Sequence, residues 1–176
     1  MAGCSVEYSL CPESLLPKSV DEGLEIYNYF TQKLEVNPKK IALIGDSAGG
    51  SLVLLMIQRL IEEGLPTPCC GVTMSAWDVP SEGESYVTNK EKDSYLDQDT
   101  VRIWGELSVG NIQVDPDKMK CFWIGHKHSL NAPEFSYLSE NASFKGFCPL
   151  FLSASEWETM RDDSTRVVER CKEDGV

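Results

Sequence analysis

A serine set among glycines at the end of an apolar run constrains this chain more than any other stretch. Residues 41–44, Ile-Ala-Leu-Ile, are typical of a buried strand, and Gly-Asp-Ser-Ala-Gly-Gly follows at 45–50. Residues 51–61 are apolar around most of a helical circumference, as expected for a helix packed against a parallel sheet. The stretch therefore predicts a strand, a sharp turn with Ser47 at its apex, and a helix.

This turn has the pattern of a nucleophile elbow, in which a serine hydroxyl stands exposed between a strand and a helix. A serine on so tight a turn is forced toward strained backbone angles. We therefore expect Gly45 and Gly49, two residues before and after it, to lack side chains for steric reasons. The unpaired N–H groups of the helix would point back at Ser47, and the Ala48 N–H could donate to a developing oxyanion.

Other interpretations of this glycine-rich stretch fit its context less well. A phosphate-binding loop of the Walker type requires Gly-Lys followed by Ser or Thr, which is absent here. The string Gly-Asp-Ser also occurs in trypsin-like proteases, but those are all-β proteins and a helix is expected after Ser47. Short glycine–serine patterns arise in loops by chance, and the apolar runs on both sides argue against that reading.

Composition narrows the class of protein. At 176 residues, with 41% hydrophobic and 25% charged residues, the chain suits one globular domain with its own core. The formal net charge of −12 argues against nucleic acid and anionic membranes as partners, because no basic stripe exists to meet phosphates. No apolar run is long enough to span a bilayer, and no signal peptide is evident.

The seven cysteines are odd in number and show no paired metal-binding spacing. We interpret them as reduced thiols in a reducing compartment, the cytoplasm. The adjacent Cys69 and Cys70 are interpreted as small buried residues at the start of a strand. No metal and no cofactor is expected.

The rest of the chain predicts further strands and helices that alternate. Strands are expected at 5–8, 71–75 and 149–155, and helices from residue 19, over 51–61 and over 161–173. The first helix would begin at Ser19 with Glu22 as its capping-box partner. Such alternation indicates a parallel α/β sheet with right-handed crossovers, in which active residues lie beyond the carboxyl ends of the strands. Ser47 and Ser75 both lie there.

Between residues 81 and 147 the pattern loosens. We interpret this segment as a lid-like or surface excursion from a single partial domain that covers 1–176. A helix is expected at 100–107, and much of the remainder reads as irregular. Trp104 and Trp123 would then supply apolar walls over the mouth of the site, and a surface insertion with no role is the alternative.

Four motifs carry a family resemblance. Residues 7–13 read Glu-Tyr-Ser-Leu-Cys-Pro-Glu, residues 45–50 read Gly-Asp-Ser-Ala-Gly-Gly, residues 75–77 read Ser-Ala-Trp, and residues 158–163 read Glu-Thr-Met-Arg-Asp-Asp. Together they resemble the hormone-sensitive-lipase-like branch of the α/β-hydrolases, which includes carboxylesterases and arylacetamide deacetylases. That family has Asp-Tyr-Arg-Leu-Ala-Pro-Glu, an identical elbow, Ser-Pro-Trp and Asp-Pro-Leu-Arg-Asp-Glu at these places.

The resemblance implies a partial α/β-hydrolase fold and a serine carboxylic-ester or amide hydrolase that acts on a small-molecule or lipid-like ester. Ser47 would be the nucleophile that forms an acyl-enzyme, and Ala48 an oxyanion donor. Glu158 takes the place of the catalytic acid. The elbow residues that carry over are Gly45, Asp46, Gly49 and Gly50. Two alternatives remain open: Glu158 caps a helix in a box with Ser155, or Asp162 is the acid.

Two departures from the family bear on activity. The His-Gly-Gly-Gly segment that supplies the other oxyanion donors is absent, so the strands at 5–8 and 41–44 would each lack a neighbour. The triad histidine should follow the acid, yet none occurs after His128. We interpret His126 and His128 as an exposed pair in a loop. A metal site is the second interpretation, and a displaced triad base is the third. The chain alone is therefore expected to be inactive, and the rival reading is a non-catalytic splice form or pseudoenzyme that acts as a binding protein.

Overall fold

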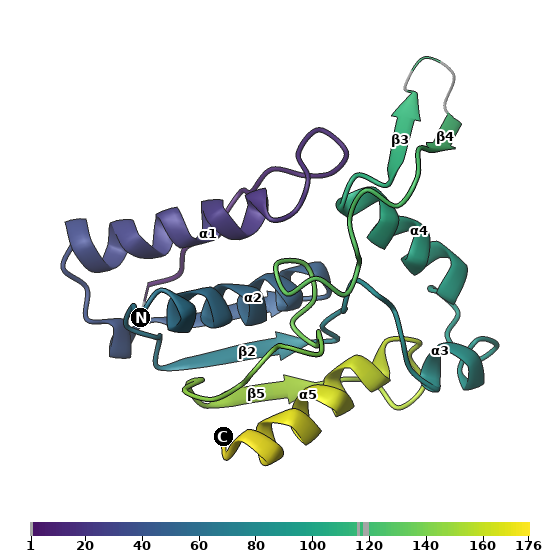
Figure 1. Ribbon diagram of the computed structural model, residues 1–176. Coiled ribbons are helices and arrows are strands. Elements are labelled where there is room, and N and C mark those ends of the chain that lie inside the picture. Colours follow the sequence, from purple (N-terminus) through teal and green to yellow (C-terminus); the bar gives the residue numbers. More distant parts are fainter. Residues whose placement is uncertain (1, 116, 118–119) are drawn as a thin grey trace.

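The computed structural model describes residues 2–115, 117 and 120–176 (Figure 1). Within this part of the chain a parallel sheet has the strand order β1-β2-β5, and β3 and β4 form a separate antiparallel pair. The elements in chain order are α1 (Lys18–Asn28), a π-helical turn (Tyr29–Lys33), a 3₁₀ turn (Pro38–Lys40), β1 (Ala42–Asp46), α2 (Ala48–Glu62), β2 (Cys70–Met74), α3 (Ser85–Thr88), α4 (Gln98–Ser108), β3 (Ile112–Asp115), β4 (Lys120–Trp123), β5 (Leu150–Ser153) and α5 (Arg161–Asp174).

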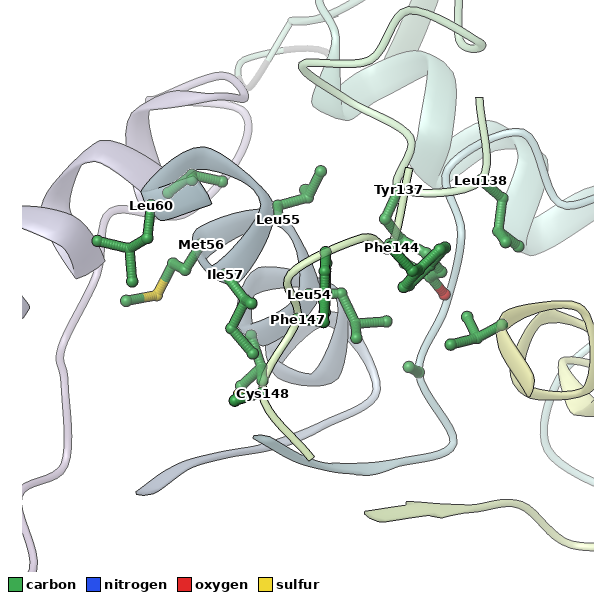
Figure 2. Close-up of a cluster of buried hydrophobic side chains, with 14 of the residues drawn as sticks. Leu54, Leu55, Met56, Ile57, Leu60, Tyr137, Leu138, Phe144, Phe147 and Cys148 are labelled. Carbon is green, nitrogen blue, oxygen red and sulfur yellow. The ribbon is translucent and has the colours of Figure 1, made fainter. Parts of the chain in front are cut away.

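The main core lies between the sheet and the helices α1, α2 and α5. Helix α2 is buried along most of its length, because the sheet covers one side of it and α1 the other. This is the all-round apolar helix that its sequence predicts. Figure 2 shows Leu54 and Ile57 of α2 beside Phe144, Phe147 and Cys148 in this core. Fully burying a side chain such as Leu or Phe stabilises the fold by roughly 1.5–3 kcal/mol.

The opposite face of the sheet is largely open to solvent. Ile44, Val72 and Phe151 are direct register partners across the strands, and Ile44 and Phe151 are 66% and 63% exposed. The outer edge of β1 pairs with no other strand of the described residues. Parallel sheets in globular proteins are normally covered on both faces. This row of side chains, which we call the bare face, is therefore an exposed apolar surface.

The strand expected at residues 5–8 is not formed. Residues 2–10 have no regular secondary structure and are mostly exposed. A strand needs a hydrogen-bonding neighbour, and the neighbour implied by the family resemblance is not among these 176 residues. The expected strands at 71–75 and 149–155 are present as β2 and β5, because they can pair directly with each other and with β1.

The capping box expected at Ser19 is also wrong. Helix α1 begins at Lys18, and Pro17 is its N-cap residue with no side-chain capping bond. The Glu22 carboxylate instead accepts hydrogen bonds from the Ser9 N–H at 2.7 Å and the Ser9 hydroxyl at 2.8 Å. Glu22 thus connects the N-terminal segment to α1.

The described residues of the segment 81–147 form more regular structure than their sequence suggests. The expected helix is α4, capped by the Asp97 carboxylate, and a second small core forms beneath it from the residues Trp77, Val79, Tyr86, Val101, Val109, Phe135 and Met160. The end of the segment runs back into the main core through Tyr137 and Phe144 (Figure 2). Trp104 and Trp123, expected as apolar walls, are 44% and 51% exposed.

Candidate active site

Ser47 occupies the turn between β1 and α2 in a conformation that few serines adopt. Its backbone angles are φ 53° and ψ −120°, and positive φ is uncommon for residues other than glycine. The turn is held because the Ser47 N–H donates to the Met74 carbonyl at 2.8 Å, and the Ser47 carbonyl accepts from the Ser51 N–H at 3.2 Å. Such strain persists only where surrounding contacts enforce it, and it clusters at functional sites.

The glycines around Ser47 have different roles from those expected. A Cβ added at Gly45 would lie 2.1 Å from the Gly49 carbonyl oxygen, so a side chain is excluded there. A Cβ at Gly49 would meet nothing within 4 Å, so the expectation of a steric requirement at that position is wrong. The close approach falls instead at Gly50, where a Cβ would lie 2.9 Å from the Ala76 Cβ. The reason is that Gly49 faces outward on the first turn of α2, whereas Gly50 packs against the segment after β2.

Ser75 links the elbow to the candidate acid. It follows Met74 directly, has a φ of 49°, and its N–H donates to the Ser153 carbonyl at 2.7 Å. The Ser75 hydroxyl donates to Glu158 Oε2 at 2.8 Å. The parallel register aligns the ends of β1, β2 and β5, so the elbow and Glu158 lie at the same edge of the sheet. Sequence reasoning placed Ser75 at this edge but did not identify its bond to Glu158.

Glu158 is not a helix cap. Helix α5 begins only at Arg161, with Met160 as its N-cap residue, so a box with Ser155 would lie too early in the chain. Within the described residues, Glu158 Oε1 is buried and has no hydrogen-bond partner. A buried carboxylate oxygen without a partner is costly, and here it lies on the residue that the family resemblance assigns to the acid.

Both carboxylate oxygens of Asp162, in contrast, accept hydrogen bonds. Its Oδ2 accepts from the Ser85 N–H at 2.8 Å, and its Oδ1 accepts from the Arg161 guanidinium at 2.8 Å. Partial burial opposes ionisation, but the hydrogen bond from Ser85 and the Arg161 charge together hold the pKa of Asp162 below its usual value. The geometry therefore favours Glu158 over Asp162 as the residue able to bind a further donor.

The two histidines lie on the surface of the segment 81–147. His126 packs edge-on against Trp123 at 4.7 Å, and His128 against Phe135 at 5.7 Å between ring centroids. Neither imidazole is hydrogen-bonded to Ser47 or Glu158. In the part of the chain that the structure describes, no group of three or more His, Cys, Asp or Glu side chains is arranged to hold a metal ion. The exposed loop pair is thus the reading that this geometry favours.

The sequence profile of a family described as alpha/beta hydrolase fold matches residues 2–176. This chain belongs to the α/β-hydrolase fold family. The crystal structure of an esterase from the bacterial hormone-sensitive lipase family is similar, with a TM-score of 0.83 and 31% sequence identity. The likeness covers 97% of this α/β-hydrolase chain and 51% of the esterase.

Curated relatives agree with that placement. An acetyl-hydrolase of Streptomyces hygroscopicus is 28% identical over 161 residues, which are 91% of this chain and 48% of the relative. An acetyl esterase of Salmonella paratyphi B is 26% identical over 172 residues, which are 92% of this chain and 48% of the relative. This α/β-hydrolase chain thus spans about half the length of the curated relatives it matches. The predicted fold class and the resemblance to the hormone-sensitive-lipase branch are confirmed.

Sequence reasoning missed a pair of buried carboxyl groups in this α/β-hydrolase, those of Asp78 and Asp163. Asp163 Oδ2 accepts from the Asp78 N–H at 3.0 Å and from the Tyr86 hydroxyl at 2.6 Å, and Asp78 Oδ2 accepts from the Ser136 hydroxyl at 2.9 Å. Burial raises the pKa of Asp78 to about 7, and burial with the nearby Asp78 charge raises the pKa of Asp163 well above its usual value. These bonds join α5 to the segment 81–147 and to the chain just after Ser75.

No helix in the described parts of the chain is both long enough and apolar enough to cross a membrane.

Proposed function

We propose that Ser47 is the nucleophile of a carboxylic-ester hydrolase that works through an acyl-enzyme. The observation that carries this proposal is the conformation of Ser47, a strained serine at the carboxyl end of a parallel strand and directly before a helix. A helix start presents N–H groups and the positive end of its dipole to whatever lies in front of it. That environment suits a hydroxyl that must attack a carbonyl group and leave an oxyanion behind.

The proposed reaction proceeds in two acyl-transfer steps. Ser47 Oγ attacks the ester carbonyl carbon while a histidine removes its proton, and the tetrahedral oxyanion accepts a hydrogen bond from the Ala48 N–H. The alcohol leaves with the proton from the histidine, and water then releases the acid from the acyl-enzyme. In this scheme Glu158 orients the histidine and stabilises the imidazolium, through the Oε1 that has no other partner among the described residues.

The histidine and the remaining oxyanion donors would come from outside residues 1–176. No histidine follows Glu158 in the sequence, and both histidines present are packed against aromatic rings of the segment 81–147. The isolated chain should therefore hydrolyse p-nitrophenyl acetate hardly faster than buffer, because removing the general base of a triad leaves only a small residue of activity.

Short acyl esters are the substrate class that the relatives support. One curated relative is named an acetyl-hydrolase and another an acetyl esterase, and both match more than nine-tenths of this chain. We therefore propose esters of small carboxylic acids as substrates.

The test is a hybrid esterase, in which residues 1–176 replace the matching half of the bacterial hormone-sensitive-lipase-family esterase. That esterase would supply the histidine and the glycine-rich loop. We expect turnover of p-nitrophenyl acetate, and we expect Ser47→Ala to lower kcat by about 10⁴-fold or more. Turnover that survives Ser47→Ala in the hybrid would overturn the proposal.

A non-catalytic binding protein, for example a splice form, is the second candidate function. The observation that favours it is that both histidines of the chain pack against aromatic rings of the segment 81–147, and neither is hydrogen-bonded to Ser47 or Glu158. Circular dichroism of the hybrid esterase separates the two candidates. A hybrid that is folded but has no turnover supports the binding protein, whereas Ser47-dependent turnover supports the hydrolase.

A further inference from the structure

Two adjacent thiols, Cys69 and Cys70, lie at the start of β2, at the opposite end of the sheet from Ser47. The Cys69 thiol donates a hydrogen bond to the Cys70 sulfur, with the two Sγ atoms 3.7 Å apart. Both cysteines are free and partly exposed, so their sequence-based interpretation as buried residues is wrong. Cys70 is partly exposed because it lies on the same face of β2 as Val72, which belongs to the bare face.

The backbone holds this pair of thiols in place. The Cys69 N–H donates to the Ile41 carbonyl at 2.8 Å, and Cys70 is the register partner of Ala42 in the sheet. The sulfur separation is therefore set by the strand pairing, which fixes the two Cα positions, and by the χ1 torsion of each cysteine.

The separation of the sulfurs selects the chemistry that suits them. A disulfide needs its sulfurs about 2.05 Å apart, so the observed 3.7 Å corresponds to two separate thiols. A thiophilic atom with bonds of about 2.3 Å, the length that zinc makes to thiolate, holds two sulfurs about 3.8 Å apart at a tetrahedral angle. The Cys69–Cys70 pair already has this spacing.

The number of protein side chains that can act as donors restricts the kind of ligand. A structural zinc site takes four protein donors, and the described residues contain no group of three or more suitable side chains. A third thiol, Cys148, lies close enough for charge on Cys70 to affect it, but it is buried, and burial is the main cause of its raised pKa. A soft centre that needs only two protein thiols fits this pair better than zinc does.

We propose that Cys69 and Cys70 form a dithiol site for trivalent organoarsenicals. Two arsenic–sulfur bonds form, the oxygen of an arsenoxide leaves as water with the two thiol protons, and arsenic stays trivalent, so no oxidant or reductant is required. The site is independent of the proposed esterase function, because it lies at the other end of the strands.

The protonation state of the pair gives a second, contrasting expectation. Burial, together with the hydrogen bond from Cys69, raises the pKa of Cys70. The thiolate is the form that reacts with alkylating agents, so iodoacetamide should modify Cys70 slowly at neutral pH. The arsenoxide carries its own proton acceptor and bridges both sulfurs, so it should react readily under the same conditions.

The experiment measures intact mass after equimolar phenylarsine oxide is added to the folded 176-residue chain. We expect one phenylarsenic group per chain, removed by excess 2,3-dimercaptopropanol but not by the same concentration of a monothiol. Cys69→Ser and Cys70→Ser should each abolish the adduct, and Cys148→Ser, the matched control two residues before β5, should retain it. Circular dichroism verifies that each variant is folded.

Three results would overturn the dithiol site. They are the absence of an adduct on the folded native chain, an adduct that persists in Cys69→Ser or Cys70→Ser, and an adduct that is lost in Cys148→Ser.

Discussion

At the scale of single residues, the site is built on two serines with positive φ. Ser47 at the end of β1 and Ser75 at the end of β2 have φ values of 53° and 49°, and each N–H donates to the carbonyl of the neighbouring strand end. A single residue in such a conformation costs on the order of 1–3 kcal/mol. The sheet stabilises both turns. As a consequence Ser47 and Ser75, the hydrogen-bond partner of Glu158, lie at the same edge of the sheet.

The two elbow glycines give a matched pair of substitutions. Gly45→Ala should lower the free energy of unfolding by about 1–3 kcal/mol, because its Cβ would overlap the Gly49 carbonyl oxygen. Gly49→Ala should be neutral or stabilise by up to about 1 kcal/mol, because the position is open and helical. Urea unfolding of the 176-residue chain measures both, and equal losses in the two variants would contradict the elbow geometry.

Glu158 and Asp162 are distinguished by the same kind of comparison. In the hybrid esterase, Glu158→Gln should lower kcat by about 10³–10⁴-fold, as amide replacement of a triad acid does. Asp162→Asn should lower kcat less than Glu158→Gln does, because the Asp162 carboxylate is already hydrogen-bonded to Ser85 and Arg161. The initial rates of p-nitrophenyl acetate hydrolysis measure both, and a larger loss in Asp162→Asn would reassign the acid.

At the scale of elements, the strands that form are those whose neighbours are present. The elbow strand, α2, β2 and β5 could be predicted from the sequence because apolar runs and glycine turns are local signals. Residues 5–8 show the limit of such signals, since their strand depends on a neighbour far from them in the fold. The bond between Ser75 and Glu158 was likewise beyond local pattern, because it joins two segments through the register of β2 and β5.

The buried Asp78 links α5, the segment 81–147 and the end of β2, and it makes their packing sensitive to pH. Its pKa is raised by burial to about 7, against about 3.9 for Asp in an unfolded chain. The folded state therefore binds more protons, so this contribution is fully present below pH 4 and is lost as pH rises through 7. The free energy of unfolding should fall over that window.

Asp78→Asn tests this linkage. The variant removes the titrating group while keeping its shape, so the decline in the free energy of unfolding between pH 4 and pH 7 should become shallower. Asp99→Asn, at an exposed carboxylate on α4, is the control and should leave the slope unchanged. Urea unfolding measured across the pH range gives the free energy of unfolding of each variant. If the free energy of Asp78→Asn falls with pH as steeply as that of the native chain, the Asp78 carboxyl group is not the cause of the decline.

At the scale of the whole molecule, the one-sided cover of the sheet and the net charge of −12 have opposite effects on association. The bare face favours self-association, since large exposed apolar patches mark contact surfaces, and the charge opposes it. Because salt screens the charge, association of the 176-residue chain should rise between 0.05 M and 0.5 M salt, by about tenfold or more in sedimentation equilibrium.

Phe151→Glu identifies the surface responsible. It places a charge at the β5 end of the bare face, where Phe151 is 63% exposed, and should weaken association at every salt concentration. Val87→Glu on α3, where Val87 is 69% exposed, is the control and should associate like the native chain. If both variants behave alike, the bare face is not the contact surface.

The proposed hydrolysis depends on Ser47 standing at the edge of the sheet as an activated nucleophile once a complete site surrounds it. The most direct measurement is peptide mass spectrometry of the folded hybrid esterase after treatment with a fluorophosphonate. We expect one phosphonyl group per chain, attached to Ser47 and absent from Ser47→Ala. A folded, active hybrid whose adduct lies on any other residue, or that takes up no adduct, would contradict it.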